Sequence, residues 1–133
     1  MIIDTSALVA IVRDEPEKGL FFSRIIEAQR SGEPIRMSAA TLVELTTVID
    51  RYRDARASEL LDVLLAELAL EIVPFDADLG LVARRANRRF GKGFHPARLN
   101  LGDCFSYALS KATNEPLLFK GKDFPQTDVQ AAV

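Results

Sequence analysis

The sequence predicts an α/β/α sandwich built on a mainly parallel sheet, and three features of the chain indicate this fold class. Short apolar runs alternate with longer segments of helical periodicity, the order expected when each strand is followed by a helix that packs back on the sheet. The chain has 133 residues, 48% of them hydrophobic and 27% charged, which suits one self-sufficient core. No repeat, low-complexity tract or linker interrupts it. We therefore expect a single domain over residues 1–133.

The first half of the chain is expected to supply two strands and four helices. Ile2 and Ile3 form a brief first strand, and Thr5 or Ser6 can cap the apolar helical segment 7–12. The further elements predicted here are a helix over 17–30 closed by Gly32, a strand over 35–37, a helix from a Ser38 cap to about Tyr52, and a helix over 59–70.

The second half adds two strands and two helices. The third strand, over 72–75, contains Pro74, so it is an edge strand or ends early. Asp76 is the expected cap of a helix over 77–90, and the glycines at 91 and 93 break that pattern. The remaining predictions are a helix over 101–112, a strand over 116–119, and a turn at Gly121.

Four acidic residues fall where such a sheet gathers its ligands, at the carboxyl ends of the strands. Asp4 and Asp123 are expected just after strands, and Glu44 and Asp103 near the starts of helices that open toward the same edge. Four carboxylates in one cleft cannot all stay ionised at low cost without a cation. Oxygen-only ligands favour Mg²⁺ or Mn²⁺ over zinc. A cation that activates water there would hydrolyse a phosphodiester without a covalent intermediate.

Each acid also has a purely structural interpretation. Asp4 can cap the first helix, and Glu44 completes a Thr-x-x-Glu pattern, which is the signature of a capping box. Asp103 follows Asn100 at that same spacing, and Asp123 fits a turn. Only the order and placement of the four acids together favour a catalytic site.

Four blocks of sequence contain these acids: Ile3 to Leu8, Ser38 to Glu44, Leu99 to Cys104, and Lys120 to Phe124. Together they resemble the conserved blocks of the VapC family of PIN-domain toxins, and the stretch 91–103 resembles a common subgroup of that family. The resemblance spans nearly the whole chain. It implies a PIN-like fold, Mg²⁺- or Mn²⁺-dependent endoribonuclease activity on RNA, homodimerisation, and inhibition by a co-encoded antitoxin.

Carried over residue by residue, the resemblance makes Asp4 and Asp103 the principal metal ligands. Glu44 and Asp123 match the remaining acids, which complete the metal shell or position the attacking water. Thr5 or Ser6 matches the hydroxyl that supports the first acid, and Thr127 and Asp128 match a trailing pair whose role is open. Lys122 stands where a small polar residue is more usual, which weakens the match of Asp123.

Between Asp78 and Asp103 the chain has no acidic residue, and its basic residues follow a helical stripe into the loop before Asp103. This stripe can hold RNA phosphates beside the metal, or it can be an ordinary solvated helix face. His95, the only histidine, is a general acid near the cleft or, as we favour, a residue that orders its loop. The candidate RNA-binding residues are Arg84, Arg85, Arg88, Arg89, Lys92 and Arg98.

Charge and cysteine content limit the setting. The formal net charge of −2 gives no whole-molecule attraction for nucleic acid, so a polyanion site must be built locally. A single cysteine, Cys104, allows no intrachain disulfide and favours a reducing compartment, so we expect a cytoplasmic protein. The leucine-rich stretch 60–68 is mostly core, but its breadth, together with Phe21 and Phe22, leaves surface for a second subunit or an antitoxin helix.

Two other functions fit parts of the pattern. A phosphoryl-transfer domain on a similar sheet, a receiver or an aspartate-nucleophile phosphatase, would also place Asp4 after the first strand. A receiver has an acidic pair there, and the phosphatase has a second Asp where this chain has Ser6. A catalytically inactive module that only binds protein or RNA is the other alternative, although it has no reason to gather four acids.

Overall fold

Four short parallel strands form the sheet at the centre of the molecule. In chain order they are β1 (Ile2–Ile3), β2 (Arg36–Ser38), β3 (Glu71–Val73) and β4 (Leu117–Leu118), and in the sheet they lie in the order β3-β2-β1-β4. This is a computed structural model, and it describes all residues, 1–133. Because β1 lies between β2 and β4, the residues that follow it are central to the edge where the strands end.

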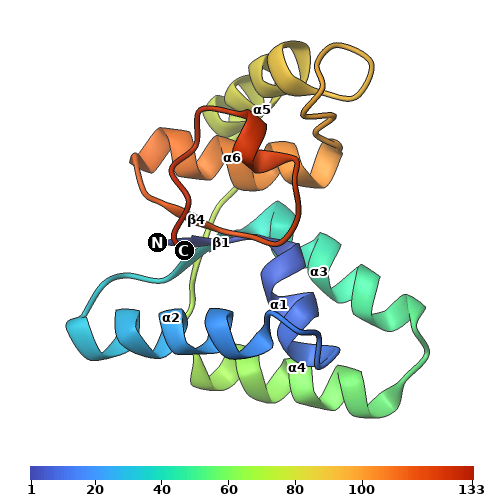
Figure 1. Cartoon of the computed structure of the whole chain (residues 1–133), viewed down its shortest axis with the longest axis vertical. Helices are drawn as coiled ribbons and strands as arrows, with labels where there is room; N and C mark the ends of the chain where they lie inside the picture. The colour runs from blue at the N-terminus through green and yellow to red at the C-terminus, as the bar shows by residue number, and fades with distance from the viewer.

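Helices cover both faces of the sheet, four on one face and two on the other (Figure 1). Ile3 packs in the core beneath the four helices, whereas Ile2 packs in the core beneath the other two, as the alternation of a strand requires. The first group is α1 (Thr5–Val12), α2 (Lys18–Ser31), α3 (Ala39–Arg51) and α4 (Ala55–Glu67), and the second is α5 (Ala77–Phe90) and α6 (Leu101–Thr113). The predicted α/β/α sandwich is confirmed.

Several predicted boundaries are correct for the predicted reason. Gly32 ends α2 with a φ of 73°, in the left-handed region where glycine is unstrained. Ser38 caps α3, and Asp76 caps α5 by accepting from the N–H of Leu79. β3 is an edge strand that stops at Val73, just before the proline.

Two helices start at least two residues before their predicted starts. The cap of α1 is Asp4, and Thr5 is already the first helical residue, so the predicted Thr5 or Ser6 cap is wrong. α4 begins at Ala55, four residues before the predicted start, because Asp54 accepts from the N–H groups of Arg56 and Ala57. The first turn of α4 carries few apolar residues, so the periodicity did not reveal it.

The segment after β4 forms a short 3-10 helix, η1 (Phe124–Gln126), and then returns along the sheet. Ala131 pairs with Leu117, so the two chain ends lie close together, as Figure 1 also shows. Asp128 fixes this segment by accepting from the Tyr107 hydroxyl at 2.7 Å and from Arg89 at 2.9 Å. No helix combines the length and apolarity needed to cross a membrane.

Candidate active site

Asp4 lies directly after β1, where it is almost completely buried. Its Oδ2 accepts from the backbone N–H of Ser6 at 2.9 Å and from the Ser6 hydroxyl at 2.6 Å. Its Oδ1 accepts from the hydroxyl of Ser106, on α6, at 2.6 Å. Asp4 therefore does cap α1, but capping alone explains neither its burial nor a donor that comes from a helix 102 residues further along the chain.

The Ser6 hydroxyl is itself held in place, because it accepts from the backbone N–H of Lys120 at 2.9 Å. This contact ties the loop after β4 to the start of α1, so both segments lie at the same edge of the sheet. The Lys120 ammonium does not contact Asp4 and instead pairs with Glu15 at 2.6 Å and Glu17 at 2.9 Å. It does not neutralise Asp4.

Glu44 lies in the second turn of α3, and its Oε2 accepts from the hydroxyl of Thr5 at 2.7 Å. Burial raises the pKa of Glu44 and the charge of Asp4 adds to the rise, while the hydrogen bond from Thr5 opposes it. The capping-box interpretation of Glu44 is wrong, because α3 begins after Ser38 and its first turn contains no acid. The carboxylate faces the start of α1 instead.

Gly102, in the first turn of α6, sits against this carboxylate. A Cβ at position 102 would lie 1.8 Å from Oε1 of Glu44, so any side chain there would displace it. The sequence offered one signal for this packing: glycine, a poor helix former, lies inside a predicted helix next to a candidate ligand.

Asp103 takes part in capping α6, as its structural interpretation predicts, and one of its two carboxylate oxygens has no hydrogen-bond partner in the protein. Its Oδ2 accepts from the N–H of Asn100 at 2.7 Å, and Asn100 returns the bond at 2.9 Å, which completes a capping box. Its Oδ1 has no hydrogen-bond partner in the protein. Burial raises the pKa of Asp103 to about 7, and the charges of Asp4, Asp123 and Glu44 act in the same direction.

Asp123 lies at the start of the turn that opens η1, where its carbonyl accepts from the N–H of Gln126 at 3.2 Å, as its structural interpretation predicts, but its side chain makes no capping hydrogen bond. It is exposed, and its charge reaches Asp103. The charges of Asp4, Glu44 and Asp123 all act on Asp103, so the four acids lie in the same region of the molecule. No three of them approach closely enough to form a ready-made cation centre in this structure.

The donor set nevertheless fits a hard divalent cation. Every candidate ligand is a carboxylate oxygen, and none of the four acids has a basic side chain or amino group as an ion-pair partner. Burial is the main cause of the raised pKa values of Glu44 and Asp103, and an excess of negative charge from neighbouring acids raises them further. A cation would relieve this excess.

An open cleft of about 400 Å³ adjoins the carboxylates, between the first turns of α3 and α6. Its walls include Val43 and Leu101, both strongly exposed, together with Phe105. Glu44 and Gly102 form part of the lining, so the cleft is continuous with the acidic cluster. This cleft is not predictable from the sequence, because its walls come from helices far apart in the chain.

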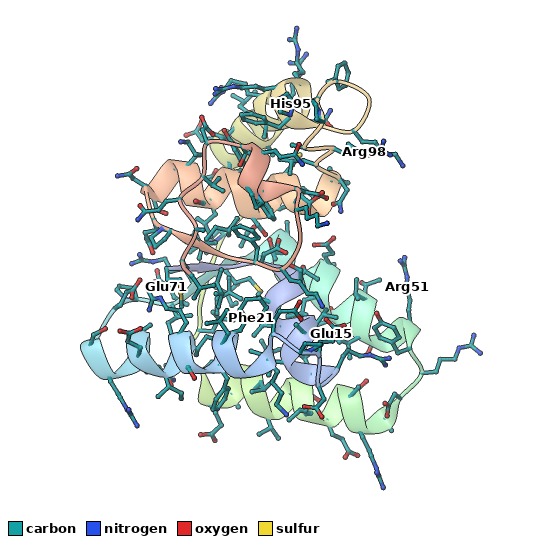
Figure 2. The ribbon with its side chains drawn as sticks, viewed as in Figure 1. Glu15, Phe21, Arg51, Glu71, His95 and Arg98 are labelled. Atoms are coloured by element: carbon teal, nitrogen blue, oxygen red, sulfur yellow. The ribbon has the colours of Figure 1, made fainter.

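The six candidate RNA-binding residues are all exposed. Arg89 is engaged, since it pairs with Asp128 and stacks over the ring of Phe90. Arg98 lies two residues before the cap of α6, and Figure 2 shows its side chain extending away from the molecule. The basic stripe therefore runs along α5 and through the loop to the start of α6, and one of its residues, Arg89, is held in an ion pair.

Three further predicted side chains have structural contacts. His95 accepts from the N–H of Ala97 at 3.1 Å and packs edge-on against Phe90, which matches the expectation that it orders its loop. Thr127 donates to the carbonyl of Phe124 at 2.7 Å and, like Asp128, holds the C-terminal segment. Cys104 is buried, and burial raises the pKa of its thiol to about 11, which favours the protonated, unreactive form.

Comparison with known proteins places these observations in a family. Residues 1–130 match the PIN domain family model. The chain is 46% identical to Ribonuclease VapC of Mycolicibacterium smegmatis over 132 residues, which cover 98% of both chains. It is 45% identical to Ribonuclease VapC42 of Mycobacterium tuberculosis over 133 residues, with 99% of this chain and 98% of the relative covered.

Solved structures show the same fold at lower identity. VapC20 of Mycobacterium tuberculosis, a Sarcin-Ricin loop cleaving toxin, superposes with a TM-score of 0.72 at 20% identity, covering 96% of this chain and 95% of that one. VapBC2 of Rickettsia felis, bound to a DNA fragment from its promoter, gives a TM-score of 0.76 at 16% identity, covering 98% and 94%. These matches support the fold, and the family matches disfavour the receiver and phosphatase alternatives.

Proposed function

The chain belongs to the VapC family of PIN-domain ribonucleases, and from this membership we propose that it is the toxin of a toxin–antitoxin pair, a divalent-metal-dependent endoribonuclease. The single observation that carries the proposal is the acidic cluster at the carboxyl end of the sheet. Four carboxylates gather there without an ion-pair partner, and two of them have raised pKa values. A purely structural cluster would be neutralised by neighbouring cations.

We propose Mg²⁺ or Mn²⁺ as the cation, held chiefly by Asp4 and Asp103, with Glu44 and Asp123 completing its surroundings. Oxygen ligands without histidine or cysteine suit these ions. When bound, such a cation activates a water molecule and offsets the charge on the leaving oxygen of a phosphodiester.

The acids of the site have different roles in this proposal. Asp4 is immobilised by its hydrogen bonds, so it offers a fixed oxygen, whereas Oδ1 of Asp103 is free of protein partners. Glu44 is held on one oxygen by Thr5 and kept close by Gly102. Its pKa is raised above that of an ordinary glutamate, chiefly by burial, which makes it a stronger base for accepting a proton from an attacking water.

RNA would be bound locally, since the net charge of −2 gives no general attraction. The exposed, unpaired members of the basic stripe, Arg84, Arg85, Arg88, Lys92 and Arg98, supply phosphate contacts in this proposal.

The proposed partners are a co-encoded antitoxin and a second copy of the chain. Exposed apolar side chains on α2 and α4 give either partner a surface to cover: Leu20, Phe22, Leu60 and Val63. Both helices contribute to the same core, and Gln29 of α2 donates to the carbonyl of Glu67 at the end of α4. We place the protein in the cytoplasm, where its RNA substrate is made.

Incubation of the purified chain, freed of antitoxin, with structured RNAs tests the proposed activity. Cleavage should require Mg²⁺ or Mn²⁺, stop in excess EDTA, and return when the metal is added back. Cleavage that persists in excess EDTA would refute a metal-dependent nuclease. Phosphate release from a small phosphomonoester, without RNA cleavage, would favour the phosphatase alternative.

A further inference from the structure

Ser106 lies in the middle of α6 with no exposed surface, and its hydroxyl points at the candidate ligand Asp4. The distance from Ser106 Oγ to Asp4 Oδ1 is 2.6 Å, which is short for a hydroxyl bond and typical of an ionised acceptor. Thr41 of α3, also without exposed surface, lies with its Oγ1 3.3 Å from Ser106 Oγ. Three elements thus meet in a chain of buried polar groups.

The direction of these hydrogen bonds follows from proton counting. A hydroxyl has one proton to donate, and an ionised carboxylate only accepts. The proton of Ser106 therefore points to Asp4, and Thr41 must be the donor in its contact with Ser106. The relay runs from Thr41 through Ser106 to Asp4.

The relay determines which part of Asp4 remains available. A carboxylate has about four lone-pair positions. Ser6 uses both positions on Oδ2, through its N–H and its hydroxyl, and Ser106 uses one on Oδ1. The single position that the protein leaves open is on Oδ1, the oxygen that Ser106 holds.

We propose that Ser106 and Thr41 are positioning residues of the cation site: they fix the orientation of Asp4 so that one oxygen, Oδ1, is presented to the metal. This inference rests on the proposed function. Hydrogen-bond partners of metal ligands set the orientation and basicity of the ligand, and their loss typically lowers metal affinity or activity by about 10- to 100-fold. Nothing in the pattern of acids reveals these two residues, because both are neutral.

Ser110 provides a matched control. It lies one turn further along α6, is also buried, and donates its hydroxyl to the backbone carbonyl of Glu115 at 2.7 Å. Replacing Ser106 or Ser110 by alanine removes the same atoms from the same helix. Only Ser106 touches a proposed ligand.

The experiment compares the full chain, freed of antitoxin, with Ser106→Ala, Thr41→Val, Thr41→Ser and Ser110→Ala. Mn²⁺ binding is measured by titration, and RNA cleavage is measured over a range of Mn²⁺ and RNA concentrations. Ser106→Ala should weaken Mn²⁺ binding about 10- to 100-fold. Excess Mn²⁺ should restore most of its cleavage rate, and the KM for RNA should be unchanged at saturating metal. Thr41→Val should shift Mn²⁺ affinity in the same direction by less, Thr41→Ser should restore it, and Ser110→Ala should match the parent.

Equal Mn²⁺ affinity in Ser106→Ala and Ser110→Ala, with the parent binding metal and cleaving RNA, would overturn this inference and leave the proposed function intact. A parent that neither binds Mn²⁺ nor cleaves RNA would instead overturn the proposed function. If Ser106→Ala does not fold, as its circular dichroism would show, the Thr41 pair decides: equal affinity in Thr41→Val and Thr41→Ser contradicts the relay.

Discussion

Carboxylates lie at both ends of the sheet, but they are paired with cations at one end and unpaired at the other. At the amino ends of the strands, three glutamates are matched by three cations in a continuous network: Glu33, Glu71 and Glu115 with Arg24, Arg36 and the amino group of Met1. At the carboxyl ends, four acids have no cationic partner. The protein therefore neutralises the carboxylates at the amino ends of the strands with its own cations, whereas the four acids at the carboxyl ends have no such partner.

The titration of the two ends reflects this difference. Burial disfavours ionisation of Glu33 and Glu115, but their Arg24, Arg36 and Met1 partners outweigh it and lower the pKa of both carboxyls. Burial also disfavours ionisation of Glu44 and Asp103, and there the neighbouring acids add to it, so the pKa of each rises. Acids are structural where the protein pairs them and candidates for function where it does not.

The largest expected effect is loss of cleavage when the unpaired end is neutralised. Asp4→Asn and Asp103→Asn should each lower RNA cleavage by about 1000-fold or more, because a misplaced cation loses several kcal/mol of transition-state stabilisation. The metal-free Asp103→Asn variant should be at least as stable as the parent, since it removes the repulsion between Asp103 and its acidic neighbours. Single-turnover cleavage and thermal melting measure both effects. Full activity in these Asn variants would return the acids to a capping role, because Asn is a comparable cap.

Gly102→Ala should disturb the same end without removing a charge. The added Cβ would overlap Oε1 of Glu44, so the carboxylate must leave its contact with Thr5. We expect cleavage to fall about 10- to 100-fold, as for other losses of ligand positioning. Gly19→Ala is a suitable control in cleavage assays, because a Cβ there meets no atom within 4 Å. Parent-like cleavage by Gly102→Ala would show that the position of Glu44 is unimportant.

The unpaired cations of the basic stripe offer a third case. Reversing Arg84, Arg88 and Lys92 to Glu should weaken RNA binding by about tenfold or more and flatten its salt dependence, because fewer counterions are released on binding. Folding should change little at these exposed positions. Reversal of Arg30, exposed on α2 across the sheet, is the control in binding titrations at several salt concentrations. An unchanged salt slope would make the stripe an ordinary solvated face.

Removing an ion pair at the amino ends of the strands should lower the stability of the fold without changing RNA cleavage. Glu115→Gln removes a half-buried charge that contacts both the Met1 amino group and Arg36, so we expect a loss of about 1–2 kcal/mol in the free energy of unfolding. Its cleavage rate and its response to Mn²⁺ should match the parent below the melting temperature. Urea unfolding measures the first and cleavage assays the second. A Glu115→Gln variant that loses metal dependence would contradict the division between the two ends.

An effect of similar size is expected in the pH dependence of the metal-free protein. Between the ordinary pKa of Asp near 4 and the raised value of about 7, the native state keeps a proton on Asp103 that the unfolded chain has lost. Stability should therefore fall as pH rises from 5.5 to 8, by about 2 kcal/mol at most for a shift of this size. Groups with lowered pKa values, such as Glu115, already make their full contribution to folding stability at pH 5.5, so they do not change the profile above it. Saturating Mg²⁺ or the Asp103→Asn substitution should remove the decline, and a flat profile in the metal-free parent would contradict it.

The sequence predicted the layers of the fold and the four acids because both depend on local signals: periodicity, caps, and acids near strand ends. It misled where a local pattern was satisfied differently. The Thr-x-x-Glu pattern at Glu44 is no capping box, since Ser38 already caps that helix. Asp103 shows the converse, because it is a cap and a candidate ligand at once.

What the sequence could not reveal depends on how helices are placed against one another. Ser106 reaches Asp4, and Gly102 reaches Glu44, only because α6 packs across the starts of α1 and α3. The pairing of Glu115 with Arg36 and the Met1 amino group likewise depends on the order of strands in the sheet. No periodicity or spacing encodes such contacts, so the neutral and small residues of the site were missed.

The most direct test of the central claim is a Mn²⁺ titration in which free Mn²⁺ is followed by its electron paramagnetic resonance signal. The parent should bind Mn²⁺ saturably, Asp103→Asn should bind it much more weakly, and Glu115→Gln should bind it as the parent does. If Asp103→Asn and the parent bind Mn²⁺ equally, the acids at the carboxyl end of the sheet are not the cation site.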